Sequence, residues 1–285
     1  MKRTDFRFAE RLRIRWAEVD MQKIVFNGHY LLYFDTAVAG YWRALALPYH
    51  ETMDQLEGDL FVRKATLEYV ASARYDDLCE VGIRCARIGK SSIVFAAAMF
   101  RDEQLLVHGE LVYVFADPVA RTSRPVPPPL RAALEALERG EPMVELRLGS
   151  WDELGAEARR IRRQVFIDEQ KIPAPLDEDP ADARAVHAVA FNRLGLAVAT
   201  GRWVEVADGS ARIGRLAVAA ALRGSGHGVA LLEALLASAR ERGMSEAMLH
   251  ARQSAVRFYE RAGFVVRGLP FEEAGLVHLE LARTL

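Results

Sequence analysis

The sequence predicts an α+β protein built from two domains. Its 285 residues are enough for two, because a domain usually holds about 100–200 residues. The first half reads as one strand, one long helix and a run of antiparallel strands, whereas the second half alternates strands and helices around a glycine-rich turn. A proline-rich tract at residues 124–129 breaks the strand pattern. We therefore expect domains at residues 1–139 and 144–285, with residues 140–143 as the linker.

The first domain begins with a strand and a long helix. Residues 11–16 alternate apolar and charged side chains, which is typical of a strand with one buried face. Apolar residues then recur at helical spacing from Leu31 as far as Leu47, and Pro48 is expected to end the helix. Four strand-like runs follow, at residues 59–69, 78–88, 91–101 and 105–116. This order is that of the hot-dog fold, in which an antiparallel sheet wraps a long helix.

The segment between the first strand and the helix carries a candidate catalytic carboxylate. Trp16-Ala-Glu-Val-Asp20, followed by Ile24-Val-Phe-Asn27 and His29-Tyr-Leu31, resembles the start of the 4-hydroxybenzoyl-CoA-type acyl-CoA thioesterases. The resemblance covers about residues 8–137 and implies that Asp20 attacks the thioester or activates water to do so. An aspartate in a loop also commonly caps a turn, so both readings stay open. The chain departs from the family at Lys23, where glycine is common.

Thioester hydrolysis also needs donors for the developing oxyanion and a place for coenzyme A. Backbone amides at the start of the helix, around Asn27, Gly28 and His29, are suited to the oxyanion. Lys90 and Ser91, in the turn after the second long strand, are candidates for phosphate contacts, although a solvated hairpin tip is an equal reading. A small sheet of this kind has an open edge and a bare face, so we expect a homodimer or a higher homo-oligomer.

The second domain is organised around a strand, a glycine-rich turn and an apolar helix. Strands are expected at residues 144–148, 186–191, 194–205 and 210–218, with a capping box at Ser150 and Glu153. The turn Arg223-Gly-Ser-Gly-His-Gly228 precedes the helix, and such a turn offers backbone amides to a phosphate or pyrophosphate. No Walker Gly-Lys-Ser/Thr is present, and Glu246 begins the next strand instead of ending it, which disfavours a dinucleotide site. A tight turn without a ligand remains the alternative.

This turn and the residues downstream resemble the GNAT-superfamily N-acetyltransferases. The resemblance implies a mixed twisted sheet with flanking helices, a pantetheine-binding strand and a pyrophosphate loop for acetyl-CoA. The residues implied in binding coenzyme A are Leu216, Ala217, Val218, Arg223, Gly224, Ser225, Gly226, His227 and Gly228. Residues 254–264 resemble the second signature, which implies that Tyr259 lies beside the cofactor sulfur, where a phenol with a pKa of about 10 can reprotonate the thiolate.

Two further runs, residues 162–170 and 271–278, resemble the ElaA-like branch of these enzymes, so the likeness spans about residues 144–283. The chain departs from the common pattern at Arg252, which replaces an asparagine, and at His227, which replaces an apolar residue. An acceptor amine must lose a proton before it attacks. The candidate bases are Glu169, His187, Glu273 and His278. Residue type alone does not show whether each of them acts as a base or has a structural role.

Composition also limits the partners, the compartment and the metal sites that are expected. The net charge of −1 gives no reason to expect a nucleic acid or an anionic membrane as partner. The chain has no apolar run of about 20 residues and no signal-peptide pattern, and its two cysteines, Cys79 and Cys85, lack metal-ligand spacing. We expect a cytoplasmic protein without a metal.

These observations together predict a bifunctional protein that uses acyl-CoA. The first domain would hydrolyse an acyl-CoA thioester, and the second would transfer an acetyl group from acetyl-CoA to an amine acceptor, with coenzyme A handled as substrate in both. The alternative is a non-catalytic acyl-CoA sensor or scaffold in which only one domain is active.

Overall fold

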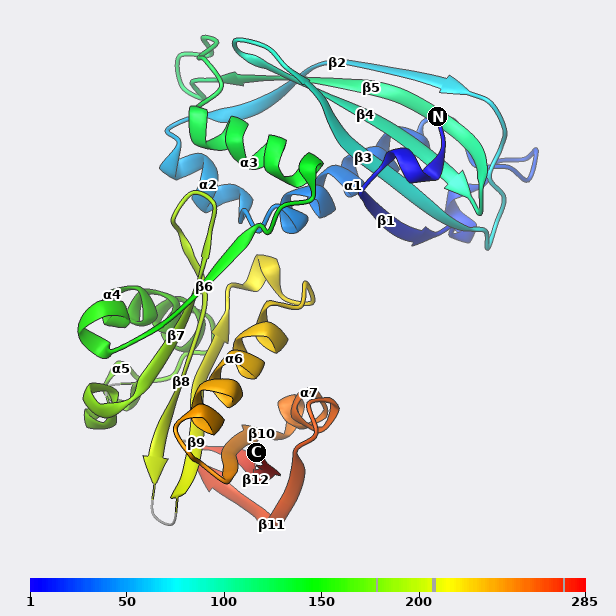
Figure 1. The fold of residues 1–285 in the computed structure, drawn as a ribbon. Helices are drawn as coiled ribbons and strands as arrows, with labels where there is room; N and C mark the ends of the chain where they lie inside the picture. The colour runs from blue at the N-terminus through cyan, green and yellow to red at the C-terminus, as the bar shows by residue number, and fades with distance from the viewer. Residues whose placement is uncertain (178, 207–208, 274) are drawn as a thin grey trace. The chain divides into compact units, whose positions relative to one another are not determined.

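Two sheets organise the chain, one of five strands and one of seven in the part that the structure describes. The computed structural model describes residues 1–177, 179–206, 209–273 and 275–285, without the side chain of Glu273. The sheets belong to separate compact units, Met1–Met143 and Val144–Leu285 (Figure 1). No helix in the described ranges is long and apolar enough to cross a membrane.

The first unit is an antiparallel sheet wrapped on one long helix, as predicted. Its strand order is β1-β3-β4-β5-β2, so β1 and β2 are the edges. Helix α1 buries Phe34 and Ala37 completely, and the ring of Tyr41 packs edge-on against Phe8 of β1 and Phe95 of β4. The elements are η1 (Arg3–Asp5), β1 (Phe8–Arg13), η2 (Trp16–Glu18), α1 (His29–Ala44), α2 (Tyr49–Gln55), β2 (Asp59–Tyr69), β3 (Leu78–Ile88), β4 (Ser92–Arg101), β5 (Gln104–Ala116) and α3 (Pro128–Arg139).

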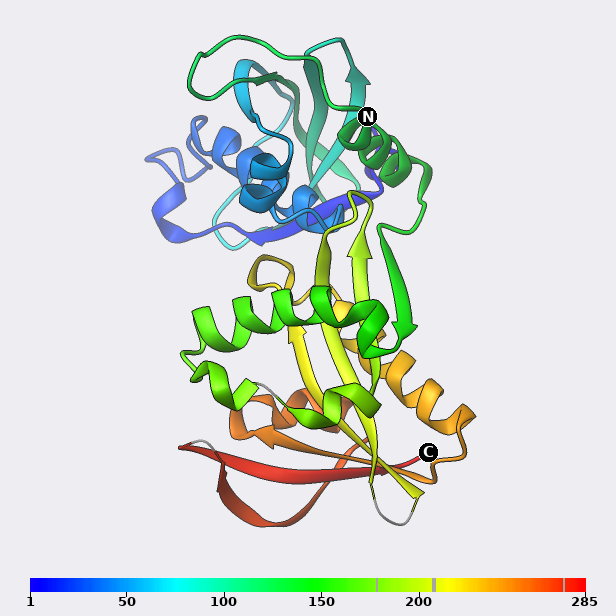
Figure 2. The ribbon, with the colours of Figure 1, turned by 90° about the vertical axis from the view of Figure 1, so that its left-hand side faces the viewer.

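The second unit is a mixed sheet with helices on both faces, also as predicted. Its order is β11-β12-β10-β9-β8-β7-β6. Ala217 of β9 packs in one cluster with Leu154 and Ile161 of α4, whereas a side chain at Gly201 would meet Leu231 of α6, so the two helices cover opposite faces (Figure 2). The elements are β6 (Val144–Gly149), α4 (Trp151–Arg162), η3 (Arg163–Glu169), α5 (Ala174–Asp177), η4 (Pro180–Arg184), β7 (Val186–Asn192), β8 (Ala197–Val206), β9 (Ser210–Val218), η6 (Ala220–Leu222), α6 (His227–Glu241), β10 (Glu246–Arg252), η7 (Gln253–Ala255), α7 (Val256–Arg261), β11 (Val265–Glu273) and β12 (Leu276–Thr284).

Several boundaries differ from those expected. The first strand lies earlier in the chain than residues 11–16, because Trp16 already begins a 3₁₀ turn. The sequence did not predict α2: Ala46 takes a left-handed φ of 55°, which ends α1, and Pro48 then caps a second helix instead of only stopping the first. Strand β8 starts at Ala197, since Gly195 forms a turn that the Asn192 side chain stabilises by accepting from Leu194 and Leu196.

Candidate active sites

Asp20 lies in a short hairpin loop that leads into α1. Val19 and Val25 form an antiparallel bridge, and the Asp20 amide donates to the Ile24 carbonyl at 2.9 Å. The half-buried carboxylate of Asp20 accepts from the Gln22 amide at 2.8 Å through Oδ1, so the turn-capping role is real. Lys23 completes the turn with a φ of 61°, a conformation for which glycine is best suited. Within the described residues Oδ2 has no partner, and one carboxylate oxygen is left to act on a ligand.

The same loop positions the predicted oxyanion donors. The Phe26 amide donates to the Glu18 carbonyl at 3.0 Å, and the Asn27 carbonyl accepts from the Tyr69 hydroxyl at 3.2 Å. The backbone amides of Asn27 and Gly28 donate to no protein acceptor within the described ranges. The His29 amide is already used, since it donates to the Phe26 carbonyl at 2.9 Å, and the His29 ring lies between Phe26 and Tyr33. Asn27 and Gly28 are therefore the better placed donors.

A buried carboxylate supports this loop, and the sequence did not single it out. Glu18 is only 3% exposed and accepts from the Arg15 amide and guanidinium, both at 2.7 Å. Burial opposes ionisation of Glu18, but the bonds from Arg15 prevail and lower the pKa of its carboxyl. Burial and the neighbouring Glu18 carboxylate raise the pKa of Tyr33.

Lys90 and Ser91 lie at the other end of β3. Leu78, the first residue of this strand, pairs with Arg13 just before the Asp20 segment, and Ile88 is ten residues further on. At about 3.3 Å per residue, the turn is about 30 Å along the sheet from Leu78, the end of β3 nearer the Asp20 segment. The carbonyls of Lys90 and Ser91 accept from Val126 and Phe115, both at 2.8 Å. A single chain therefore does not bring these residues together with the carboxylate.

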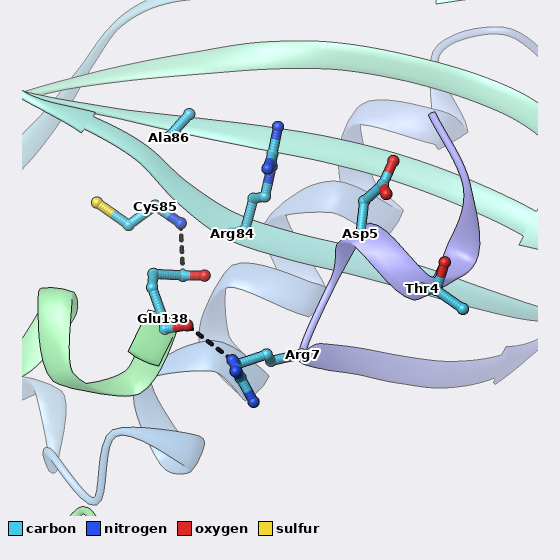
Figure 3. Close-up of a pocket in the computed structure, with 7 residues that line it drawn as sticks. All are labelled: Thr4, Asp5, Arg7, Arg84, Cys85, Ala86 and Glu138. Carbon is cyan, nitrogen blue, oxygen red and sulfur yellow. Dashed lines mark hydrogen bonds between the residues drawn. The ribbon is translucent and has the colours of Figure 1, made fainter. Parts of the chain in front are cut away.

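A cavity in the first unit contains none of the predicted site residues (Figure 3). Its volume is about 500 Å³. Glu138 of α3 dominates it and accepts from the Cys85 amide at 2.8 Å and the Tyr41 hydroxyl at 2.5 Å, while its carbonyl accepts from Arg7 at 2.7 Å. These groups satisfy one another's hydrogen-bonding capacity and hold α3 against the sheet. Burial also raises the Cys85 thiol pKa to about 12, which makes the thiol unreactive.

In the second unit, β9 and β10 run parallel and then separate. Their pairing covers three residue pairs and ends at Arg212 with Met248. Beyond it β9 continues to Val218 and β10 to Arg252 without pairing to each other. The separation leaves the side of β9 that faces β10, from Leu216 to Val218, without a strand partner. Every other pair of neighbouring strands in the described part pairs over more of its length. The gap between β9 and β10 is therefore the natural entry for an extended ligand.

The glycine-rich loop lies at the end of this gap. Gly224 and Gly226 have φ angles of +82° and +85°, and no atom lies within 4 Å of where a side chain would begin. The amides of both glycines donate to no described acceptor, and those of His227 and Gly228 begin the 15-residue helix α6. Free amides, open space and a helix N-terminus together are the features of an anion site.

Two side chains shape the loop. Arg223 is held by a bidentate ion pair, both contacts at 2.6 Å, to Glu169 of η3, and its Nε donates to the Val218 carbonyl at 3.1 Å. The bond from Arg223 lowers the pKa of Glu169. His227 keeps its Nε2 buried without a described partner, and burial lowers the pKa of this imidazole. His227 is therefore neutral near pH 7 when no ligand is bound.

Tyr259 lies on α7, which packs against the loop. A side-chain carbon added to Gly228 would come within 3.6 Å of the ring of Phe258, the neighbour of Tyr259. The Tyr259 ring packs edge-on against Phe258 and Phe264. Its hydroxyl has no partner in the described chain, and burial raises the Tyr259 pKa to about 12. The phenol therefore stays protonated at neutral pH and is able to donate.

The four candidate bases differ sharply in how they are held. Glu169 is paired with Arg223, and the side chain of Glu273 lies outside the described part. His187 is 1% exposed, donates from Nε2 to the Asp182 carbonyl at 3.0 Å, and has a pKa lowered by burial. His278 is half-buried, and its Nδ1 donates to the Leu276 carbonyl at 2.9 Å. A carbonyl only accepts, so Nδ1 carries the proton and Nε2 of His278 keeps a free lone pair.

A buried network of three arginines and three aspartates lies beside this site, and its pairing was not predicted. Arg162 of α4, 2% exposed, contacts Asp177 at 3.0 Å and Asp182 at 2.8 Å. Arg202 of β8 pairs with Asp179 and Asp182. Arg215 of β9 is held more loosely. The network fixes the segment from η3 to η4 on the sheet. Among the described residues no group of His, Cys, Asp and Glu is arranged to hold a metal.

Comparison with known proteins assigns each unit to a family. The family model described as "Acetyltransferase (GNAT) domain" matches residues 166–285, and the one described as "Thioesterase superfamily" matches residues 22–108. YjcF of Bacillus subtilis, described as an uncharacterized N-acetyltransferase, is 32% identical over 124 residues, which cover 43% of this chain and 87% of the relative. The acyl-CoA thioester hydrolase YbgC of Escherichia coli O157:H7 is 29% identical over 132 residues, which cover 45% of this chain and 93% of the relative.

Among solved structures, Escherichia coli ElaA is 27% identical with a TM-score of 0.46, covering 50% of this chain and 99% of that one. The two family models match non-overlapping parts of the chain, and each match falls within one compact unit. The chain therefore joins a hot-dog domain of the thioesterase superfamily to a domain through which it belongs to the GNAT acetyltransferase family.

Proposed function

We propose that the second unit transfers an acetyl group from acetyl-CoA to an amine. The observation that carries this proposal is the gap between β9 and β10, which leads to a loop of unpaired amides at the start of α6. The gap suits the extended pantetheine arm. The amides of Gly224, Gly226, His227 and Gly228 suit the pyrophosphate.

The side chains at the end of the gap suit the chemistry. The amine nitrogen attacks the thioester carbonyl carbon and gives its proton to Nε2 of His278. The C–S bond then breaks, and the departing thiolate takes the phenolic proton of Tyr259, so free coenzyme A and an acetylated amine leave. Tyr259 is suited to this step because burial keeps it protonated.

Replacing Tyr259 by Phe is expected to lower kcat for amine acetylation by about 10- to 100-fold. The KM for acetyl-CoA should change little, because the ring and its packing against Phe258 and Phe264 remain. Steady-state kinetics with a thiol-detecting reagent checks both values. The exposed Phe26→Leu exchange, in the other unit, is the matched control. An unchanged kcat in Tyr259→Phe would remove the phenol from the mechanism.

The first unit, we propose, hydrolyses an acyl-CoA thioester. Asp20 has a free carboxylate oxygen in the loop that also holds the unpaired amides of Asn27 and Gly28. In this scheme the carboxylate takes a proton from water, the water oxygen attacks the thioester carbon, and the two amides bind the oxyanion. Cleavage of the C–S bond yields a carboxylic acid and coenzyme A. The relative YbgC is described as an acyl-CoA thioester hydrolase, which supports this assignment.

The first unit should act as a homodimer formed along β2. This strand is a sheet edge of 11 residues, and it exposes apolar side chains on both faces: Phe61 is 44% and Val62 58% exposed. Long apolar edges normally pair with another strand. The turn at Lys90 and Ser91 would then be available to the partner's carboxylate, which the single chain does not allow.

Val62→Lys is expected to weaken dimerisation by about 100-fold, because edge lysines prevent strand pairing. Sedimentation velocity should show a shift toward monomer, together with loss of thioester hydrolysis and unchanged amine acetylation. Val119→Lys, at a loop residue that is 91% exposed, should have no effect. A wild-type monomer at micromolar concentration would contradict the proposed interface.

A further inference from the structure

Arg252 is an unpaired cation at the mouth of the gap between β9 and β10. It is the last residue of β10, it is half-buried, and it pairs in register with His278 of β12. Its guanidinium has no hydrogen bond, ion pair or ring contact in the described parts of the chain.

The alternation of the strands places Arg252 on the face that an acceptor would approach. Arg202 of β8 contacts η4. Arg212 of β9 lies two register positions from Arg202, so both side chains project from the same face of the sheet, the face that η4 covers. His250 contacts Arg212 at 3.0 Å, so His250 and, two residues later, Arg252 project to that face. His278 and Phe271 follow in register on the neighbouring strands.

Two of the described carboxylates on this face are already committed to other cations. Glu280, opposite His250, and Glu246 at the start of β10 both accept from Arg267, at 2.7 Å and 3.1 Å. Neither is therefore available to neutralise Arg252.

A second guanidinium lies across the gap. Arg215 is in a bulge of β9 with a left-handed φ of 54°, immediately before Leu216. Its Nε is buried without a hydrogen bond, its Nη2 donates to the Leu176 carbonyl at 3.2 Å, and its nearest carboxylates, Asp177 and Asp179, are 3.9 Å and 3.6 Å away. Bulges often re-aim a side chain at a functional site. Each strand that borders the gap therefore contributes a cation: Arg252 has no described partner, and Arg215 keeps one buried donor unused.

We propose that the acceptor of the acetyl group is a primary amine that also carries a carboxylate or a phosphate, and that Arg252 binds this anionic group with Arg215 as the second cation. The inference rests on the proposed transferase function of the second unit. A guanidinium matches both anions with paired hydrogen bonds, and a half-buried site strengthens them. The anion would fix the amine between His278, which takes its proton, and the acetyl carbon.

The test compares amines that differ only in the anion: 4-aminobutyrate against its amide, and O-phosphoethanolamine against ethanolamine. The full chain is assayed as wild type, Arg252→Gln and Arg252→Lys, with Arg257→Gln as the matched control. Arg257 is exposed on α7 and has no described partner. Comparing the rates for 4-aminobutyrate and O-phosphoethanolamine shows which anion is preferred.

We expect wild type to acetylate the anionic member of a pair at least about 10-fold faster in kcat/KM. Arg252→Gln should abolish this preference, Arg252→Lys should keep part of it, and Arg257→Gln should keep all of it. The KM for acetyl-CoA should stay constant throughout. Equal rates for both members in wild type would overturn the inference. So would an Arg252→Gln variant that raises the KM for acetyl-CoA and slows both members alike, since the guanidinium would then serve coenzyme A.

If wild type acetylates no amine of either kind, the transferase proposal fails separately. Calorimetric titration of the CoA-saturated chain with O-phosphoethanolamine and 4-aminobutyrate then decides the anion site. Binding that Arg252→Gln abolishes supports it, and absence of binding to wild type contradicts it.

Discussion

Asp20→Asn is expected to lower kcat for acyl-CoA hydrolysis by about 10³-fold, the usual contribution of a positioned general base or nucleophile. The amide keeps an oxygen that accepts from the Gln22 backbone, so the loop and the fold should persist. Only the charged oxygen that acts on water is lost. A panel of acyl-CoA chain lengths, with thiol release as the readout, measures the effect.

The same variant should leave amine acetylation unchanged, because Asp20 and Tyr259 lie in different units. Asp54→Asn, a change of the same kind on α2, provides the control. Equal hydrolysis by Asp20→Asn and wild type would favour the alternative in which the first unit only binds acyl-CoA and dimerises. Asp20 would then be a turn cap and nothing more.

Arg162→Leu is expected to lower the free energy of unfolding of the second unit by about 3–5 kcal/mol, because it leaves the buried Asp177 with only the loosely held Arg215 and removes one of the two arginines that pair with Asp182. Arg163→Leu, at the next residue, removes an exposed guanidinium with no described partner and should cost less than about 0.5 kcal/mol. The pair of variants separates loss of the buried network from loss of charge.

Pulse-labelling hydrogen exchange at increasing urea concentration reports each unit separately and suits this comparison. Peptides from the second unit should lose protection at lower urea in Arg162→Leu, while those from the first unit should not change. If both variants unfold at the same urea concentration as wild type, the arginine–aspartate network does not stabilise the second unit.

The fold could be predicted because its signals are local. Alternating side chains identify strands such as β2, whose predicted and observed bounds coincide at Asp59–Tyr69, and helical spacing identifies α1. The glycine-rich loop is likewise a local pattern. Helix α2 escaped prediction because proline starts a helix as readily as it ends one, and the left-handed Ala46 that separates the helices has no sequence signature.

The site could be predicted only in part, because its pairings are distant in sequence. Glu169 has the residue type of a base, but Arg223, 54 positions further on, occupies it. Arg162 meets aspartates 15 and 20 positions away, and no spacing rule connects them. We propose His278 as the base only because the Leu276 carbonyl fixes which ring nitrogen holds the proton. Such hydrogen bonds depend on the tertiary structure.

A crystal structure of the full chain grown with acetyl-CoA tests the central claim most directly. We predict diphosphate oxygens within about 2.7–3.2 Å of the amides from Gly224 to Gly228, and the thioester sulfur beside the Tyr259 hydroxyl. Electron density for the ligand elsewhere in the second unit, with this turn left empty at saturating acetyl-CoA, would contradict the assignment of the gap and its loop to coenzyme A.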